Sequence, residues 1–436
     1  MPNKRIHLCL AHMSEAGLEQ KYIQEAFETN WVVPLGPNVN GFEKDLEDFV
    51  NDIATVEAQN VASPQQAESL HKRVVALSSG TSAVHLALIA CGVQPGDEVC
   101  VQSFTFCASS HPITYLGATP VFIDSEADTW NMDPDLLEEA IKDRIAKTGK
   151  KPKAIIPVAL YGMPYQIDRI MAIANRYDIP VIEDAAEGFG SRFNGQALGT
   201  FGQYGVLSFN GNKMITTSGG GALITNNEDE WREIMMYATQ YRESYPYYQH
   251  EKIGFNYRMS NICAGIGRGQ MTVVNDHIAH HKHVQKMYED LLRDVKGVHV
   301  HCQPPFAGYD SNYWLCTIIL DENLRIKGQD NAYKTIVEGA VGGAAGVTHL
   351  VDSATTDCQP NDNVEALRVF MDAAGIEARP VWKPMHKQPV YKDCPAYTNG
   401  VSEAIFKVGM CLPAGPYVTD EDVQYIVDSI KAAIVG

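Results

Sequence analysis

The chain has 436 residues, 45% of them hydrophobic and 20% charged, so it is long enough to bury a large core and to form two domains. Its formal net charge of −18 argues against a surface that binds nucleic acid or an anionic membrane. Ten cysteines without a Cys-x-x-Cys pair indicate free thiols, and the sequence contains neither a signal-peptide pattern nor an apolar run of membrane-spanning length. We therefore expect a soluble, cytoplasmic protein.

The N-terminal part predicts two helices and an insertion. Residues 14–30 have an amphipathic helical pattern with Ser14 as the expected cap. Pro34 and Pro37 then enforce an extended loop before a second helix. Residues 56–72 are polar and weakly patterned, so we expect a surface loop there.

Strands alternate with helices in the next part of the chain. In chain order, the expected elements are VVAL, AVHLALIACG, VCVQSFTF, ASSHPITYLG, TPVFID, Pro134–Ala146, AIIPVAL, Ile167–Tyr177 and PVIEDAA. This alternation predicts a mostly parallel sheet with helices on both faces. The large α/β domain is expected to cover residues 1–270, including an N-terminal arm.

Residues 271–436 are expected to form a smaller α+β domain. A long helix begins at Met271, and strands are expected near Tyr313–Leu320 and Glu377–Pro384. Residues 328–363 are rich in Gly, Ala, Thr and Asn. They predict a flexible insertion and not a dinucleotide loop, because no buried strand precedes their glycines.

One lysine lies in a polar turn between two apolar runs, in the stretch GVLSFNGNKMITTSGGGALIT (residues 205–225). Glycines beside Lys213 would let a flat ligand approach the backbone. One interpretation is a surface turn with a solvated lysine. The other is a lysine that forms a Schiff base with pyridoxal 5′-phosphate (PLP). This second interpretation requires a phosphate site, a partner for the pyridine nitrogen and a ring-stacking group elsewhere in the chain.

A candidate phosphate site lies in VVALSSGTSAVHLAL. A strand, a turn of small residues and a helix that begins near Thr81 and Ser82 would aim unpaired N–H groups and the helix dipole at an anion. These hydroxyls could instead simply cap the helix. Ser208, five residues before Lys213, is a second candidate phosphate donor.

Candidate partners for the ring follow two other predicted strands. Asp184 comes at the end of a β-branched strand, at the sheet edge where open α/β folds bind ligands, and could pair with a pyridine nitrogen or cap a helix. Glu187 could reach the same ring or complete a capping box. Phe104 and Phe106 are expected on one face of a strand, where either could stack on a ring or pack in the core.

Three further patterns are less specific. Asn256 and Arg258 lie in a polar loop, GFNYRMSN. His277 and His281 are one helical turn apart, but lack a nearby third ligand, so we expect a solvated face and no metal. The glycines of GIGRG (265–269) indicate a close helix contact.

Taken in order, these motifs resemble the DegT/DnrJ/EryC1/StrS family of PLP-dependent sugar aminotransferases. The resemblance covers nearly the whole chain, and its most specific stretches are SSGTSAVHLAL, VIEDAAEGFGS, SFNGNKMITTSGGGALITN and GFNYRMSN. NGNKMITTSGGG and RPVWKPMH are similar to the subgroup of bacillosamine-pathway transaminases. The insertions at 56–72 and 328–363 depart from the family pattern and leave the nucleotide-sugar loops and oligomer contacts open.

The resemblance implies an aspartate-aminotransferase-like fold (fold type I) and a role for each motif. Lys213 would bind PLP and move protons, and Asp184 would pair with the pyridine nitrogen. The remaining residues implied for the cofactor are Phe106 as the stacking ring, Glu187 near the cofactor hydroxyl, and Thr81, Ser82 and Ser208 at the phosphate. Asn256 would come from the second subunit of a homodimer with shared sites, and Arg379 and His386 would lie near the donor or the sugar.

The implied reaction is a ping-pong transfer of the amino group of L-glutamate to UDP-2-acetamido-4-keto-2,6-dideoxyglucose. A different nucleotide keto sugar, GDP-linked 4-keto-6-deoxymannose or a 3-keto sugar, is the nearest alternative. A PLP- or pyridoxamine-dependent dehydratase of the same group would have histidine at the position of Lys213. A non-catalytic PLP-binding regulatory protein is the alternative from another class.

Overall fold

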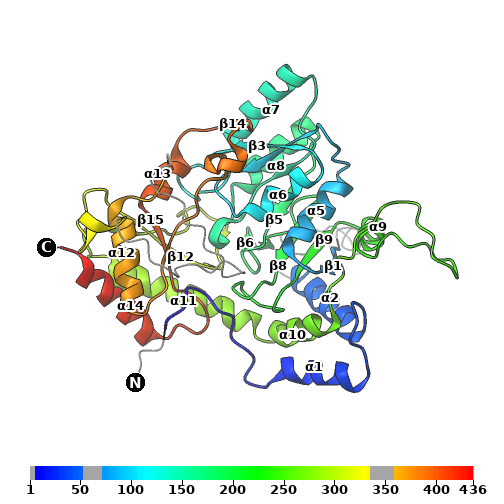
Figure 1. The fold of residues 1–436 in the computed structure, drawn as a ribbon, viewed down its shortest axis with the longest axis horizontal. Coiled ribbons are helices and arrows are strands. Elements are labelled where there is room, and N and C mark those ends of the chain that lie inside the picture. Colours follow the sequence, from blue (N-terminus) through cyan, green and yellow to red (C-terminus); the bar gives the residue numbers. More distant parts are fainter. Residues whose placement is uncertain (1–4, 53–70, 334–357, 436) are drawn as a thin grey trace.

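The computed structural model of the chain describes residues 5–52, 71–333 and 358–435. Two four-stranded sheets, β14-β3-β2-β4 and β5-β8-β9-β1, are joined by single bridges between Ile155 and Val181 and between Val158 and Asp184. The strands are β1 (Arg73–Leu77), β2 (Glu98–Gln102), β3 (Thr119–Ile123), β4 (Ile155–Ile156), β5 (Ile182–Asp184), β8 (Tyr204–Ser208), β9 (Gly221–Thr225) and β14 (Ala396–Tyr397). Together they form the central sheet of the larger part (Figure 1).

The central sheet is mostly parallel, as expected. The strands from β14 to β8 run parallel to their neighbours, whereas β9 runs antiparallel to both β8 and β1. Their side chains alternate between two buried cores. Val75, Val101 and Leu223 contribute to one core, while Val74 and Cys100 contribute to the other.

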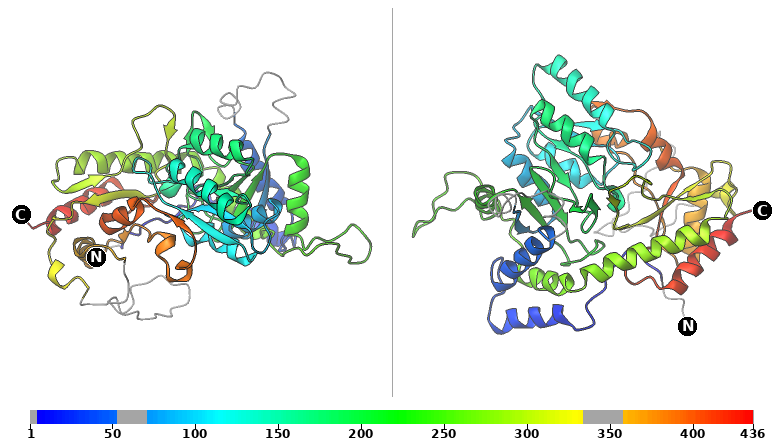
Figure 2. Two further views of the ribbon diagram at one scale, coloured as in Figure 1. Left: turned by 90° about the horizontal axis from the view of Figure 1, so that it is seen from above. Right: turned by 180° about the vertical axis from the view of Figure 1, so that it is seen from behind.

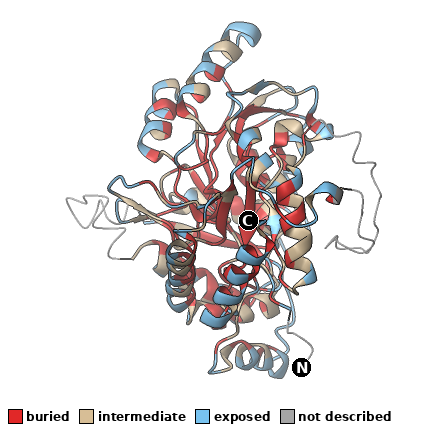
Figure 3. Ribbon diagram, turned by 90° about the vertical axis from the view of Figure 1, so that its left-hand side faces the viewer, coloured by how far each residue is buried: buried red, intermediate tan, exposed pale blue. Residues whose placement is uncertain are grey.

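Helices cover both faces of this sheet, which explains why its strands are apolar on both sides (Figure 3). One core includes residues of α5 (Gly80–Ala90), α6 (His111–Tyr115) and α9 (Glu228–Ala238). The opposite core includes residues of α2 (Pro37–Val50), α7 (Pro134–Thr148) and α8 (Ile167–Tyr177). This arrangement confirms the predicted α/β architecture.

The N-terminal helices pack against a glycine-rich helix. α1 (Leu18–Glu28) and α2 both contact α10 (Asn261–Met271). A Cβ atom added at Gly267 would lie 2.7 Å from the ring of Phe42, so the expected close helix contact is confirmed. Ser14 precedes α1 by several residues and is not its N-cap, although its hydroxyl accepts the N–H of Leu18 at 3.1 Å.

A second sheet lies in the C-terminal part, in the antiparallel order β10-β12-β15-β13. Its elements are α11 (Val274–Leu292), β10 (Val298–Val300), β12 (Cys316–Leu320), α12 (Asp362–Ala373), β13 (Arg379–Pro380), α13 (Val401–Val408), β15 (Gly409–Leu412) and α14 (Asp420–Ala433). A short sheet of β6 (Arg192–Phe193), β7 (Gln196–Ala197) and β11 (Tyr309–Asp310) accompanies them. α11 runs from α10 towards α14 and so links the two parts (Figure 2).

Each of the two parts contributes a segment to the other. β14, late in the sequence, completes the edge of the larger sheet, and Ile6, near the N-terminus, forms a parallel bridge with Ile376 in the C-terminal part. The division at residue 270 stays a prediction. The predicted insertions at 56–72 and 328–363 lie largely outside the described residues.

The solvated face expected for two histidines is wrong. His277 and His281 are buried, and their Nδ1 atoms each lie 3.1 Å from a backbone carbonyl oxygen, of Met214 and Tyr313. Burial lowers the pKa of His281 to about 3. No cluster of possible metal ligands occurs among the described residues.

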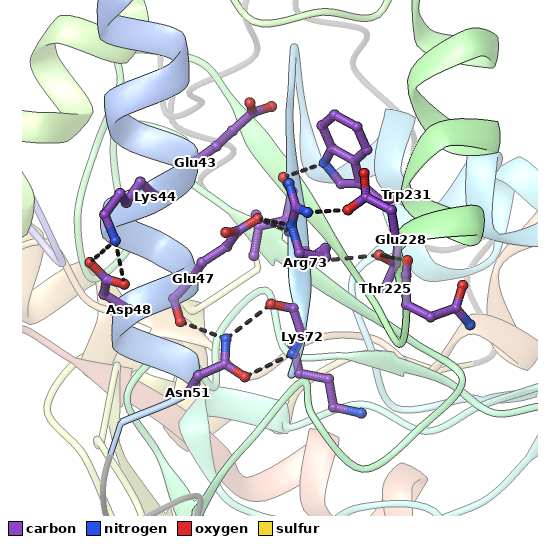
Figure 4. A network of polar contacts seen from close by, with 12 residues as sticks. Glu43, Lys44, Glu47, Asp48, Asn51, Lys72, Arg73, Thr225, Glu228 and Trp231 are labelled. Carbon is purple, nitrogen blue, oxygen red and sulfur yellow. Dashed lines mark hydrogen bonds and ion pairs between the residues drawn. The ribbon is translucent and has the colours of Figure 1, made fainter. Parts of the chain in front are cut away.

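Side chains from α2 and α9 form hydrogen bonds to the outer edge of β1, the last strand of the sheet. Glu47 accepts the N–H of Val74 at 3.0 Å and that of the Arg73 guanidinium at 2.8 Å, and Trp231 donates to the Val74 carbonyl (Figure 4). Unpaired strand edges favour pairing with other molecules. These side chains therefore protect the part of the edge that precedes the single bridge between Leu77 and Arg258.

Glu43, one helical turn before Glu47, protects the same edge from a more buried position. Its carboxylate accepts the N–H of Ala76 at 2.8 Å and pairs with Arg258, and the two charged side chains are only 10% and 8% exposed. Burial raises the pKa of Glu43, while the charge of Arg258 opposes this shift. The pair fixes the loop that carries Arg258 against β1.

We expect Glu43→Ala to lower the free energy of unfolding by about 3 to 5 kcal/mol, because it leaves a buried guanidinium and a strand N–H without their acceptor. Lys44→Ala, which breaks an exposed pair with Asp48 one helical turn later, is the matched control and should leave the stability nearly unchanged. Denaturant unfolding of both variants measures the difference. Equal stability of the two variants would show that the Glu43–Arg258 pair does not hold the edge.

Candidate active site

A pocket of about 680 Å³ lies between the carboxyl ends of β5 and β8, the first turn of α5 and residues of the C-terminal part. Seven of the residues proposed from the sequence line it: Lys213, Asp184, Glu187, Thr81, Ser208, Phe106 and Arg379. Parallel strands present their carboxyl ends at one sheet edge, which explains why residues so far apart in the sequence meet.

Lys213 lies in the turn that follows β8. The turn is closed by its own backbone, where the N–H of Lys213 donates to Asn210 at 3.0 Å, and by Trp314, whose indole N–H donates to the Asn212 carbonyl at 2.6 Å. The lysine side chain is 12% exposed, its Nζ lies 3.5 Å from Oε1 of Glu187, and the centre of the Trp314 ring is 4.1 Å away. The solvated surface lysine is therefore the wrong interpretation, because Lys213 is aimed into the pocket.

Asp184 ends β5 and is held by two donors. Its Oδ2 accepts the hydroxyl of Ser109 at 2.7 Å and its Oδ1 accepts the N–H of Ala186 at 3.1 Å. Burial raises the pKa of Asp184, whereas these hydrogen bonds and the charge of Lys213 oppose the shift. A turn follows β5, so Asp184 does not cap a helix.

Glu187 lies in the turn after β5, on the side of Lys213. Its Oε2 accepts the N–H of Tyr161 at 2.7 Å, and no helix begins here for a capping box. Burial raises the pKa of Glu187 to about 7, and the charge of Lys213 opposes this shift. Near neutral pH this carboxyl group can therefore hold or release a proton.

The first turn of α5 opens into the pocket, with a set of possible donors that differs from the expected one. Ser79 is the N-cap of the helix, and its hydroxyl accepts the N–H of Ser82 at 3.0 Å. Gly80 and Thr81 then supply the first amides, and the hydroxyls of Ser79, Thr81 and Ser208 also line the pocket.

Ser82 does not line the pocket. Its hydroxyl is buried within hydrogen-bonding distance of the hydroxyls of Ser78 and Ser79. The space between the start of α5 and the first residue of β9 is also narrow, since a Cβ atom added at Gly221 would lie 2.3 Å from the backbone nitrogen of Gly80.

The two phenylalanines do not share a strand face, so that expectation is wrong. β2 ends at Gln102, whose side chain amide donates to the Phe104 carbonyl at 2.9 Å as the chain bends away. Phe104 is fully buried, whereas Phe106 is 53% exposed and lines the pocket, with its ring centre 5.5 Å from that of Trp382. Phe106 is thus available to a flat ligand.

Arg379 reaches the pocket wall from β13, where its guanidinium pairs with Glu377 at 2.7 Å. His386 is not part of the pocket lining. Its ring lies between the Ser103 hydroxyl, 2.6 Å from Nδ1, and the Glu403 carboxylate, 3.2 Å from Nε2. Asn256 also lies outside the pocket of its own chain, on an exposed loop.

Four residues of the site were not predicted from the sequence: Ser109, Tyr161, Trp314 and Trp382, the last of which lies within RPVWKPMH. Ser109 orients Asp184, the backbone of Tyr161 orients Glu187, and Trp314 contacts Lys213. Trp382 forms the wall beside Phe106. All four lie outside the long helices and strands. In such segments the periodicity of the sequence does not indicate which way a side chain points.

Known proteins resemble this chain over nearly its full length. The model of the DegT/DnrJ/EryC1/StrS aminotransferase family matches residues 65–343 and 329–431. The putative pyridoxal phosphate-dependent aminotransferase EpsN of Bacillus subtilis is 40% identical over 98% of this chain and 95% of its own length. GDP-perosamine synthase of Caulobacter vibrioides is 32% identical over 96% of both chains.

A solved structure gives the same result for the fold. The crystal structure of a DegT DnrJ EryC1 StrS aminotransferase from Brucella abortus is 26% identical, has a TM-score of 0.76 and covers 96% of this chain and 95% of its own. The family, the fold class and the cofactor expected from the sequence are thereby confirmed. The chain belongs to the DegT/DnrJ/EryC1/StrS family of PLP-dependent sugar aminotransferases.

Proposed function

We propose that this nucleotide-sugar aminotransferase moves the amino group of L-glutamate to UDP-2-acetamido-4-keto-2,6-dideoxyglucose, giving the 4-amino sugar and 2-oxoglutarate. The observation that supports an aminotransferase reaction is that Lys213, with its side chain 12% exposed, lies beside two buried carboxyl groups in one pocket. The choice of sugar is supported by the two stretches NGNKMITTSGGG and RPVWKPMH, which are similar to bacillosamine-pathway transaminases.

A GDP-linked 4-keto-6-deoxymannose is the second candidate. The relative named GDP-perosamine synthase is 32% identical over 96% of this chain. Both candidates are 4-keto sugars, so the chemistry at the reacting carbon is the same, and the nucleotide and the substituent at C2 distinguish them.

The pocket fits PLP. The amides of Gly80 and Thr81 with the hydroxyls of Ser79 and Ser208 suit a phosphate, and Phe106 offers a ring face. Asp184, as a buried carboxylate, suits a protonated pyridine nitrogen. Ser82 would then hold Ser79 in position through hydrogen bonds, instead of contacting the phosphate itself.

The chain's own residues have distinct tasks in this reaction. When bound, PLP supplies an electron sink and carries the amino group between the two substrates. Nζ of Lys213 would bind the cofactor in the resting enzyme and, once displaced, take up and return a proton at the substrate carbon. Arg379 lies where it can bind a carboxylate of the donor. Because one pocket serves both substrates in turn, the kinetics would be ping-pong.

We also propose that the working unit is a homodimer with shared sites. Asn256 is exposed, although the nearby Tyr257 carbonyl accepts the N–H of Ser78, directly beside the phosphate turn. An exposed apolar segment, residues 31–35, adjoins this region, since the N–H of Asn261 donates to Val33 at 2.9 Å. A two-fold contact through this surface would bring Asn256 of each chain to the site of the other.

A reducing compartment such as the cytoplasm is proposed for the enzyme, because all ten cysteines are free. In the part of the chain that the structure describes, no helix has the length and apolar character needed to span a membrane.

A panel of nucleotide keto sugars with L-glutamate tests the substrate. We expect amination of the UDP-linked 4-keto sugar by the parent chain and no turnover by Lys213→Ala, which lacks the amine that moves the proton. Mass spectrometry of the amino product measures the result. Preferred amination of the GDP-linked sugar would favour the second candidate, and near-parent turnover by Lys213→Ala would contradict the role of the lysine.

Asp184→Asn should lower kcat roughly 100-fold or more, because the amide cannot keep the pyridine nitrogen protonated in the way a carboxylate does. The matched control is Asp178→Asn, at a left-handed position where asparagine is tolerated and the carboxylate pairs only with the half-exposed Lys151 among the described residues. Steady-state kinetics with bound cofactor quantified in both variants measure the effect. Unchanged kcat in Asp184→Asn would show that this residue only shapes the turn after β5.

Subunit mixing tests the shared sites. In a heterodimer of Lys213→Ala and Asn256→Ala chains, one site would hold both intact residues and the other neither. We expect activity to return partly in verified heterodimers of two folded variants that are each impaired alone. No recovery under these conditions would show that Asn256 does not act across the interface.

A further inference from the structure

Two glutamates in one short stretch are fully buried, and they face different surroundings. Glu183 and Glu187 lie four residues apart, and burial raises the pKa of each to about 7. Glu183 faces away from the pocket and accepts the hydroxyl of Tyr165 at 2.7 Å. Glu187 lines the pocket, so only one of these two similar groups can exchange a proton with a ligand or with Lys213.

The contacts of Glu187 divide its two oxygens between different tasks. Oε2 is fixed by the N–H of Tyr161 at 2.7 Å. Oε1 lies 3.5 Å from Nζ of Lys213, and in the described chain it is the acceptor that lies within hydrogen-bonding range of this amine. Asp184 differs, because both of its oxygens already accept protein donors. Glu187 is therefore fixed at one oxygen and open towards the lysine at the other.

We propose that Glu187 is the proton partner of Lys213: its Oε1 takes the proton that the lysine must lose before the amine can act as nucleophile or base. This inference rests on the proposed aminotransferase reaction. As a carboxylate, the same group stabilises the ammonium that forms when Lys213 collects a proton from the substrate.

The transfer balances without any other reactant. The N–H bond of the Lys213 ammonium breaks, an O–H bond forms on Glu187, and the ion pair becomes an amine beside a carboxylic acid. In a buried site the neutral pair avoids the cost of desolvating two charges, while the ion pair gains their attraction, so the two forms can be similar in free energy. The proton therefore need not be released to water.

The other groups that face Glu187 act on this exchange in both directions. The charge of Asp184 raises the pKa of Glu187 and that of Lys213 lowers it. Tyr161 and Cys411 stay neutral near pH 7, because burial raises the pKa of both, for Cys411 to about 12. The ring of Trp314, 4.1 Å from Nζ, stabilises the ammonium form of the lysine.

Infrared titration of the full-length chain without cofactor tests the pair directly. The carbonyl band of each protonated glutamate is assigned by its loss in Glu187→Gln and in the matched variant Glu183→Gln. In Lys213→Ala we expect the midpoint of the Glu187 band to rise by about 1 to 3 pH units, because a nearby positive charge is removed, while the Glu183 band stays in place. Lys213→Met, which keeps most of the length of the side chain without its charge, repeats the test if the alanine variant does not fold.

A kinetic measurement separates a proton partner from a neighbouring charge. Glu187→Gln should lower kcat roughly 100-fold, change KM less than about threefold, and remove the fall of kcat at acid pH, which reflects protonation of Glu187. Glu183→Gln should keep the parent pH profile. An unmoved Glu187 band in the folded Lys213 variants, or a parent-like pH profile in Glu187→Gln, would overturn the inference. Failure of every keto sugar would instead overturn only the proposed function, since the infrared coupling needs no substrate.

Discussion

A lysine that is largely withdrawn from water needs acceptors close to its amine, and this requirement determines the arrangement of the whole site. Asp184, the last residue of β5, and Glu187, in the turn after it, supply carboxyl groups next to Lys213. They lie just where the neighbouring β8 leads into the lysine turn. Each carboxyl group is in turn fixed by a donor from another segment, Ser109 or Tyr161. The chemistry therefore depends on how accurately one pair of parallel strands ends together.

The direction of β9 explains how the same turn also meets the phosphate site. Because β9 returns antiparallel to β8, its first residue, Gly221, lies beside the start of α5, where a side chain would collide with Gly80. β1 pairs with the other edge of β9 and leads directly into that helix. The lysine turn and the start of α5 thus lie at the same end of one three-stranded unit, where Ser208, Gly221 and Leu77 are neighbours. Glu43 and Glu47 protect the open edge of this unit.

The sequence alone predicts those elements in which the hydrophobic pattern and the chemical type of the side chains indicate the same structure. The alternation of strands and helices predicts the fold class, and the ends of two predicted strands predict the convergence of Asp184 and Lys213. Residues that act through an irregular segment could not be predicted, because the path of such a segment depends on tertiary contacts. Phe104 illustrates this, since a hydrogen bond from Gln102 bends the chain and removes the expected strand periodicity. Similarly, His281 is polar in sequence but buried in the fold, where a backbone carbonyl satisfies one ring nitrogen.

β14 has a consequence for synthesis of the chain. This strand, near the end of the sequence, pairs with β3, and the buried carboxylate of Asp124 accepts the backbone N–H groups of Asn399, Gly400 and Ser402 just beyond it. On the ribosome, β3 therefore emerges long before its neighbour and must wait with one hydrogen-bonding edge open. A nascent chain that stalled before residue 396 would keep that edge open to pairing with other nascent chains, so translation of β14 is the step that closes it.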